Sequence, residues 1–325
     1  MRVLSGIQSS GKLHLGNYLG AMKQHIELQH EHECLFFIAN YHSLTTVQDP
    51  ALLRQLTVDV ALDYLAMGLD PKKAWLFRQT DVPEVTELTW ILSSVTGKGL
   101  MERATSYKDK TAKGITPSMG LFCYPILMAA DILIYRSDLV PVGKDQVQHI
   151  EMTQDMAAYF NTTFKREVLK RPEVKLNEAM VVPGIDGQKM SKSYGNTIPL
   201  FDLPAQIRKL IMSIKTDSTP VEAPKNPETC NVFALYKLLA NAEEVKELEG
   251  AYRKGGMGYG EAKKRLAEVT ERLLAPARER RAKLENDPDY VEDVLVTAAK
   301  KARGIAREVM ADVREACGLV VGKGS

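Results

Sequence analysis

Short apolar runs alternate with longer helical patterns through the first half of the chain. The runs that read as strands lie at 2–6, 34–39, 74–78 and 139–142. The helical patterns cover about 14–29, 50–67, 84–95, 118–135 and 146–160. Strands separated by helix-length segments are typical of βα units, in which the strands pair in parallel and helices cover both faces of the sheet. The sequence therefore predicts an α/β fold with a doubly wound parallel sheet.

One of these helices carries clear signals at both ends. Pro50 stands at its first position, directly after the N-cap candidate Asp49, and Gly68 stands just past its end. Proline suits the first turn of a helix and glycine suits the residue after its last turn. We expect a helix from Pro50 to about Met67.

The second half of the chain follows a different pattern. After about residue 195 the β-branched runs fade and helical periodicity takes over. Breaks in this periodicity fall at 216–220, 255–256, Pro276 and 287–288. We expect a Rossmann-type domain at 1–190, completed by a returning helix at about 286–325, and a smaller α-helical domain at 195–285.

Composition narrows the class of protein. The chain has 325 residues, of which 45% are hydrophobic and 26% charged, as in an ordinary globular enzyme. No apolar run approaches the roughly 18 residues of a membrane span, and the first strand leaves no room for a cleavable leader. The net charge of +2 excludes a strongly basic nucleic-acid coat but allows a local contact surface. Four widely spaced cysteines fit a reduced compartment, and we expect a cytoplasmic protein.

Three histidines, at 25, 30 and 32, lie close together near the end of the first predicted helix. A metal site is one interpretation of such a group. The alternative is that they close the helix, where polar and partly cationic side chains suit the helix dipole. We favour the second interpretation and expect no bound metal among the protein's own ligands.

The first strand runs into a glycine-rich turn that leads directly into a helix, at residues 6–17 (GIQSSGKLHLGN). In a parallel sheet such a turn lies at the carboxyl edge, where helix N-terminal amides favour an anion. The turn is not a Walker loop, because Gly11 and Lys12 lack the required upstream glycine and following hydroxyl residue. Taken alone, it also fits a tight βα turn that simply needs small residues.

A second motif, residues 189–193 (KMSKS), is flanked by glycines at 187 and 195. Together with residues 14–17 (HLGN) it resembles the paired signatures of class I aminoacyl-tRNA synthetases. These enzymes join an amino-acid carboxylate to the α-phosphate of ATP. The reaction requires alignment and cations on the leaving pyrophosphate, which lysines on a mobile loop supply.

A third motif concerns the amino acid. Tyr124, Met128 and Asp131 are spaced to share one face of a helix, and Asp131 lies between Ala130 and Ile132. An acid flanked by apolar residues is atypical of an exposed surface position. A buried carboxylate can accept a hydrogen bond from an indole N–H. The alternative is an acid paired with Arg136, although a spacing of five is poor for that pair.

This stretch is similar to the pocket helix of tryptophanyl-tRNA synthetases, and the similarity extends over essentially the whole chain. It implies that Asp131 reads the indole nitrogen and that Tyr124 and Gln146 hold the α-amino group. The remaining residues that it places around the tryptophan are Leu4, His42, Met128 and Val142. Leu4 departs from the family, which often has an aromatic residue there.

The same resemblance implies an ATP site. Its contacts would fall on Gln8, Ser9, Ser10, His14, Gly16, Asn17, Gly143, Lys144, Asp145, Val181, Lys189, Met190, Ser191 and Lys192. Of these, Lys189, Ser191 and Lys192, with Lys110, would act on the phosphates, and Mg²⁺ would arrive with ATP. Ser9 and Lys144 depart from the residues common in the family, which leaves ATP affinity open.

The implied partners are L-tryptophan, ATP and tRNA(Trp), with a homodimer as the expected assembly and the 195–285 domain as the reader of the anticodon. Two alternatives stay open. Tyrosine-activating relatives share the fold and both signatures, and a non-catalytic or adenylate-forming paralogue could keep the fold while serving another purpose.

Overall fold

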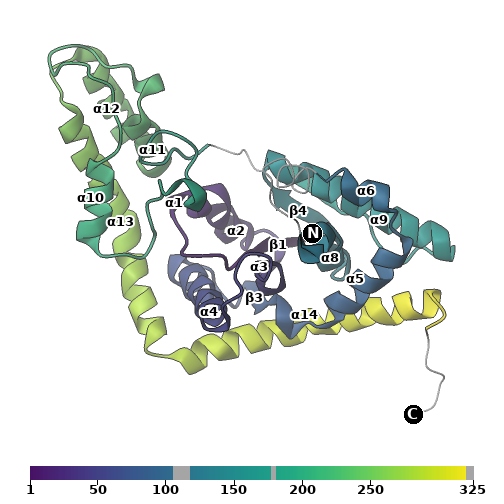
Figure 1. The fold of residues 1–325 in the computed structure, drawn as a ribbon. Helices are drawn as coiled ribbons and strands as arrows, with labels where there is room; N and C mark the ends of the chain where they lie inside the picture. The colour runs from purple at the N-terminus through teal and green to yellow at the C-terminus, as the bar shows by residue number, and fades with distance from the viewer. Residues whose placement is uncertain (105–117, 177–180, 320–325) are drawn as a thin grey trace.

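A computed structural model describes residues 1–104, 118–176 and 181–319. Its centre is a five-stranded, all-parallel sheet with the strand order β3-β2-β1-β4-β5 (Figure 1). The strands are β1 (Arg2–Ile7), β2 (Glu33–Ile38), β3 (Ala74–Arg78), β4 (Leu139–Val142) and β5 (Glu173–Leu176). This order confirms the predicted doubly wound sheet.

Helices cover both faces of the sheet because successive strand residues point to opposite sides. Val3 of β1 faces one apolar core and the neighbouring Leu4 faces the other. The helices of the first part are α1 (Leu15–Asn17), α2 (Lys23–Leu28), α3 (Asn40–Ser43), α4 (Pro50–Met67), α5 (Glu84–Val95), α6 (Lys98–Glu102), α8 (Met119–Leu133) and α9 (Val147–Phe164). Those of the second part are α10 (Pro204–Met212), α11 (Asn231–Leu239), α12 (Ala242–Lys254), α13 (Tyr259–Glu285) and α14 (Pro288–Ala316).

The order of the strands reverses between β1 and β4. β1 pairs with β2 along its whole length, but it meets β4 at one residue pair, Val3 with Leu139. Beyond this pair the two strands diverge toward their carboxyl ends. Ligands of doubly wound sheets bind in the crevice that such a reversal opens.

The helix predicted to start at Pro50 is confirmed at both ends. The Asp49 carboxylate accepts hydrogen bonds from the amides of Ala51 (2.8 Å) and Leu52 (2.9 Å). Gly68 follows the last turn with φ +115°, a conformation that glycine adopts without strain.

Two predicted elements differ from the structure. The helix expected at 14–29 is present as a continuous helical run from Leu15 to Leu28, but it is not α-helical throughout, because a π-helical turn, Tyr18–Met22 (η1), lies between α1 and α2. Pro276 does not break a helix but lies inside α13. The helix continues through it because its neighbours Leu274 and Ala277 are fully buried and this packing outweighs one lost amide donor.

The short edge strand β5 was missed by sequence reasoning. Its four residues, Glu173–Leu176, alternate charged with apolar side chains and none of them is fully buried. An exposed edge strand of this length lacks the continuous apolar run that marked the inner strands.

The second part of the chain leaves the sheet and returns to it. Helices α10 to α13 form an arm beside the sheet, and α14 runs back along β3 and α5 (Figure 1). On the return, Arg281 of α13 pairs with Asp59 of α4 (2.6 Å), and Arg303 of α14 pairs with Glu84 of α5 (2.7 Å). Among the described helices, none combines the length and apolarity needed to cross a membrane.

Candidate active site

A cavity of about 520 Å³ opens where β1 and β4 diverge. It brings together many of the residues predicted from the sequence. Those that line it are Leu4, Gln8, Gly16, Asn17, His42, Tyr124, Met128, Asp131, Val142, Gly143, Gln146, Lys189 and Met190. Residues of the two signature motifs and of the α8 face therefore meet in one space, although the chain separates them widely.

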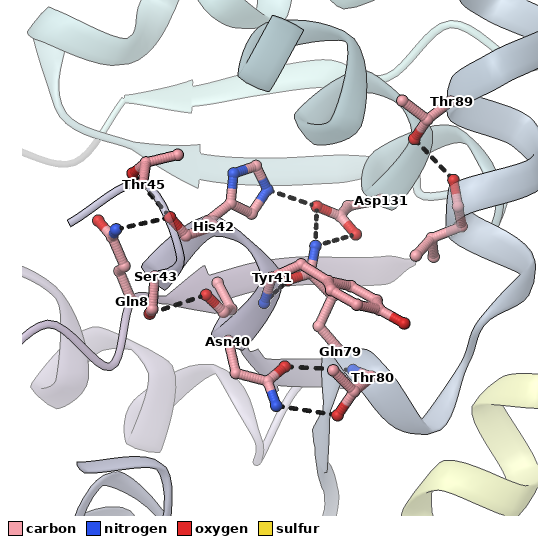
Figure 2. Close-up of polar contacts among 12 residues, drawn as sticks. Gln8, Asn40, Tyr41, His42, Ser43, Thr45, Gln79, Thr80, Thr89 and Asp131 are labelled. Atoms are coloured by element: carbon pink, nitrogen blue, oxygen red, sulfur yellow. Dashed lines mark hydrogen bonds and ion pairs between the residues drawn. The ribbon is translucent and has the colours of Figure 1, made fainter. Parts of the chain in front are cut away.

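Asp131 closes one end of this cavity from α8, where it is only 1% exposed. Its carboxylate accepts hydrogen bonds from His42 Nε2 (2.9 Å) and from Gln79 Nε2, which lies 2.9 Å from both oxygens (Figure 2). Burial raises the pKa of Asp131, and the hydrogen bonds from His42 and Gln79 oppose that rise. A carboxylate has about four lone-pair directions, so it can accept a further N–H from a ligand.

The alternative pairing of Asp131 with Arg136 is wrong. Arg136 lies beyond the end of α8 with φ +51°, and its guanidinium pairs with Asp312 of α14 at 2.8 Å. The Asp131 carboxylate is thus turned toward the cavity and the Arg136 side chain toward α14.

Gln79 was not identified from the sequence, although it supports Asp131 directly. It is 1% exposed and directly follows β3. The amide N–H of Tyr41 donates to Gln79 Oε1 (3.0 Å), which fixes the side-chain nitrogen toward Asp131 (Figure 2). Its position at the carboxyl end of a parallel strand was the available signal.

A further pair of hydrogen bonds joins the loop after β2 to the loop after β3. Asn40 Nδ2 donates to Thr80 Oγ1 (2.8 Å), and the Thr80 amide donates to Asn40 Oδ1 (3.2 Å). The His42 carbonyl accepts a hydrogen bond from Gln8 Nε2 (3.1 Å). The loops after β1, β2 and β3 are therefore cross-linked before any ligand arrives.

The remaining wall residues combine apolar and polar character. Leu4 and Val142 are buried, and Met128 is partly buried. The Tyr124 hydroxyl hydrogen-bonds His149 Nε2, and the Tyr124 ring meets His42 edge-on at 6.3 Å between centroids. An apolar slot with polar groups at its ends suits a large aromatic amino acid.

The 189–193 loop contributes Lys189 and Met190 to the cavity lining. Asn196, 2% exposed, accepts from the Ser191 amide (2.8 Å) and donates to Asp186 Oδ1 (2.8 Å) and to the Lys189 carbonyl (3.1 Å). A Cβ on Gly184 would lie 2.4 Å from Asn196 Cγ. The conformation of the loop therefore depends on the Asn196 side chain and on glycine at position 184, where a larger residue would collide with Asn196.

The loop also touches the first turn of the chain. Lys192 Nζ donates to the Gly11 carbonyl (2.8 Å), and the Gly16 amide donates to Met190 Sδ (3.2 Å). His14, 6% exposed, has an Nδ1 without a hydrogen-bond partner among the described residues. Burial, and then the charge of Lys192, lowers the pKa of His14 to about 4, so its imidazole is neutral at pH 7.

Some predicted residues lie outside the cavity lining. Ser9 is buried, with its hydroxyl 2.9 Å from that of Ser43, and Val181 is 66% exposed. The others that do not line it are Ser10, His14, Lys144, Ser191 and Lys192. Lys110 lies outside the described residues, as does the side chain of Asp145.

One interpretation from the sequence needs correction. His25 does not present a charged side chain at a helix end, because it is 2% exposed and stacks on Phe36 at 4.7 Å between ring centroids. Burial lowers the pKa of His25 to about 4. The cavity lining also includes residues that the motifs did not identify: Ser5, Gly6, Gly20, Ala21, His25, Phe37, Ala39, Ile132, Val140, Pro141 and Val182.

Comparison with known proteins agrees with this geometry. The family model of class I tRNA synthetases (W and Y) matches residues 1–275, and the chain belongs to this family. The tryptophan–tRNA ligase of Rhodopirellula baltica is 54% identical over 98% of this chain and 100% of its own length. That of Fusobacterium nucleatum is 52% identical, with 98% of each chain covered.

A solved structure extends the comparison to three dimensions. Tryptophanyl-tRNA synthetase from Campylobacter jejuni, complexed with ADP and tryptophane, matches with a TM-score of 0.91 at 48% identity. The match covers 98% of this chain and 100% of that one.

Proposed function

We propose that the chain is a tryptophan–tRNA ligase, which activates L-tryptophan with ATP and transfers it to tRNA(Trp). The observation that carries the choice of amino acid is Asp131, a buried carboxylate at the closed end of an apolar slot. An indole N–H is a donor that this carboxylate can accept, and a phenylalanine would leave it unpaired. The high identity to tryptophan–tRNA ligases supports the same choice.

In the first step the tryptophan carboxylate oxygen attacks the α-phosphorus of ATP. The bond between the α-phosphorus and the bridging oxygen breaks, and pyrophosphate leaves with that oxygen. Asp131 orients the indole, and Tyr124 with Gln146 holds the α-amino group, which places the carboxylate near Gly16 and the 189–193 loop. No protein base is required, because the attacking oxygen is already ionised.

Charge on the leaving group is met by lysines. Lys192 already lies against the first turn, where the phosphates would run, and Lys189 lines the cavity beside it. The residues proposed to act with them are Lys110 and Ser191. Mg²⁺ carried by ATP supplies further positive charge to the pyrophosphate.

In the second step the terminal ribose hydroxyl of tRNA attacks the carbonyl carbon of the adenylate, and AMP leaves. We propose that the helical arm at 195–285 recognises the anticodon and that the protein acts in the cytoplasm. The chain presents basic side chains on this arm, among them Arg208, Lys209 and Lys254, which are exposed. Such side chains suit phosphate contacts.

We also propose a homodimer. Trp90 of α5 is 76% exposed and Met119 of α8 is 71% exposed, and these two helices pack together. A nearby hollow of about 350 Å³ includes Leu44 and Leu127. Large exposed apolar side chains grouped in this way are typical of subunit interfaces. Sedimentation analysis should give a dimer for the wild type and a monomer for Trp90→Glu.

The decisive experiment is amino-acid-dependent exchange of labelled pyrophosphate into ATP, run with each of the twenty amino acids and Mg²⁺. Exchange with tryptophan alone is expected. Exchange with tyrosine would overturn the pocket assignment. No exchange with any amino acid would favour a non-catalytic paralogue.

A further inference from the structure

Three buried hydroxyl groups lie behind the first turn, and the mechanism above uses none of them. Ser9 of the turn and Ser43 of α3 are each 0% exposed, and Thr57 of α4 is 6% exposed. The Ser9 and Ser43 hydroxyl oxygens are 2.9 Å apart, and Thr57 Oγ1 lies 3.3 Å from Ser9 Oγ. The side chains come from three separate segments, so the cluster joins the first turn to α3 and α4.

The carbonyls around the cluster fix the direction of its central hydrogen bond. Ser43 Oγ donates to the Ala39 carbonyl (3.1 Å), and a carbonyl can only accept. Since Ser43 has one hydroxyl proton, it accepts in its bond with Ser9, and Ser9 donates. Thr57 likewise donates to the Leu53 carbonyl (2.8 Å). Removal of the Ser43 hydroxyl would therefore take away the nearer partner of the buried Ser9 side chain.

A second hydrogen bond joins the same two segments. Gln8 Nε2 donates to the His42 carbonyl at 3.1 Å (Figure 2). Adjacent residues of the turn, 8 and 9, are thus bonded to adjacent residues of α3, 42 and 43. Two neighbouring bonds restrict rotation as well as distance, so α3 sets the orientation of the turn.

The turn held in this way carries the contact point of Lys192. The carbonyl of Gly11, two residues after Ser9, accepts a hydrogen bond from Lys192 Nζ (2.8 Å). Gly11 has φ +136°, and a Cβ there would lie 3.3 Å from Lys192 Nζ, so the turn presents bare glycine backbone to the lysine. The position of the Lys192 charge therefore depends on where the turn holds this carbonyl.

We propose that Ser43 is a positioning residue for adenylate formation, which fixes the first turn through Ser9 and thereby places Lys192 at the leaving pyrophosphate. This inference rests on the proposed function, because it takes Lys192 to act on that group. Ser43 does not line the cavity, so it acts through the turn and not by touching a ligand. Its loss should change the adenylation rate and leave tryptophan binding unchanged.

The first test is single-turnover formation of the adenylate by the full-length protein with tryptophan, ATP and Mg²⁺. Ser43→Ala should slow this step about tenfold, because the turn loses one of its two bonds to α3. Ser9→Ala removes the same bond from its donor side and should slow the step equally. Tryptophan affinity, measured by calorimetry, should stay at the wild-type value because His42 keeps its bonds to Gln8 and Asp131.

The matched control is Thr270→Val. Thr270 of α13 is 0% exposed and donates to the Leu266 carbonyl (2.7 Å), so the variant also removes a buried hydroxyl, away from the cavity. It should leave both the rate and the tryptophan affinity unchanged. If Ser43→Ala kept the wild-type rate, or lost tryptophan affinity as strongly as rate, the proposal would fail.

A double-mutant cycle shows whether Ser43 acts through Lys192. In the Lys192→Ala protein, Ser43→Ala should cause no further loss of rate, because the side chain that it places is gone. A full additional loss of about tenfold in that background would overturn the proposal.

Limited digestion with trypsin tests the contact in the absence of substrates. Mass spectrometry follows cleavage after Lys192, with cleavage after the exposed Lys254 of α12 as the internal reference. Ser43→Ala should raise the ratio of the two rates about tenfold, because a looser turn releases the loop more often. An unchanged ratio would show that Ser43 does not hold the loop.

The two readouts separate the proposals. A wild type that forms no adenylate, with faster cleavage after Lys192 in Ser43→Ala, refutes the proposed function and leaves the link from Ser43 to the loop standing. A wild type that forms the adenylate, with Ser43→Ala equal to it in rate and cleavage, refutes the role of Ser43 alone.

Discussion

The two ends of the cavity are built in different ways. At the amino-acid end, Asp131 and Gln79 are each 1% exposed, and their hydrogen bonds are already made to each other and to His42. Where Lys189 and Met190 line the cavity, the 189–193 loop rests on the first turn through Lys192 on the Gly11 carbonyl and the Gly16 amide on Met190 Sδ. One end is a buried side-chain network, and the other is a loop held on the first turn by two side chains.

This difference separates recognition from chemistry. A preformed network can distinguish one side chain from another because a wrong ligand leaves a fixed, buried carboxylate unpaired. A loop that rests on the first turn through Lys192 and Met190 can instead move as charge develops on the phosphates. Substitutions at the two ends should therefore change different kinetic constants.

The largest effect is expected for Asp131→Ala. Loss of the indole partner should lower kcat/KM for tryptophan on the order of 1,000-fold, with the KM for ATP changed little. Pyrophosphate exchange at varied tryptophan and ATP concentrations measures both constants. The control is Asp312→Ala, which removes the α14 acid that pairs with Arg136 at 2.8 Å and does not line the cavity. Equal losses for tryptophan and ATP would contradict the separation of the two ends.

Lys192→Ala should act on rate and not on tryptophan binding. The charge that it meets develops mainly on the leaving group, so the adenylation rate should fall about 100-fold. Single-turnover formation of the adenylate gives that rate, and Lys209→Ala on the exposed face of α10 is the control. If Lys192→Ala weakened tryptophan binding without slowing adenylate formation, the loop would act on the amino acid and not on the leaving phosphates.

Gln79→Leu should weaken tryptophan binding about tenfold, since Asp131 would keep His42 but lose its other donor. The measurement is tryptophan affinity in the absence of ATP. Thr80→Val is the matched control, because it breaks the neighbouring contact with Asn40 and leaves Asp131 untouched. An equal loss in both variants would show that loop order, and not the carboxylate partner, sets the affinity.

The smallest effect concerns stability against acid. The folded pKa of His25 is about 4 against 6.5 for the ordinary imidazole, so the unfolded chain takes up its proton first as the pH falls. Protonation of this imidazole in the unfolded chain should therefore lower the unfolding free energy of the wild type by about 1 kcal/mol as the pH falls from 7 to 5.5. His25→Phe should lose correspondingly less over that interval in urea unfolding. An unchanged pH dependence would contradict the burial of a neutral His25.

The sequence predicted the sheet well because its inner strands are continuous apolar runs and its helices have strong end signals, such as Asp49 and Gly68. The motif residues that line the cavity, Asp131 and Lys189 among them, were found through their local patterns. These features depend on residues that are close together in the sequence. They can be recognised without knowing how distant segments meet.

The residues that were missed depend on distant contacts. Gln79 becomes a site residue through hydrogen bonds to Tyr41 and Asp131, which are far from it in the chain. His25 becomes buried because Phe36 and Tyr64 pack around it. The returning chain at Arg281 likewise compensates for Pro276 by holding α13 on α4. No local pattern encodes these pairings.

The most direct test of the account is calorimetric binding of tryptophan without ATP to the wild type, Asp131→Asn and Lys192→Ala. The account predicts that the wild type and Lys192→Ala bind tryptophan equally and that Asp131→Asn binds it far more weakly. Binding that survives in Asp131→Asn, or falls equally in both variants, would contradict a preformed indole site centred on Asp131.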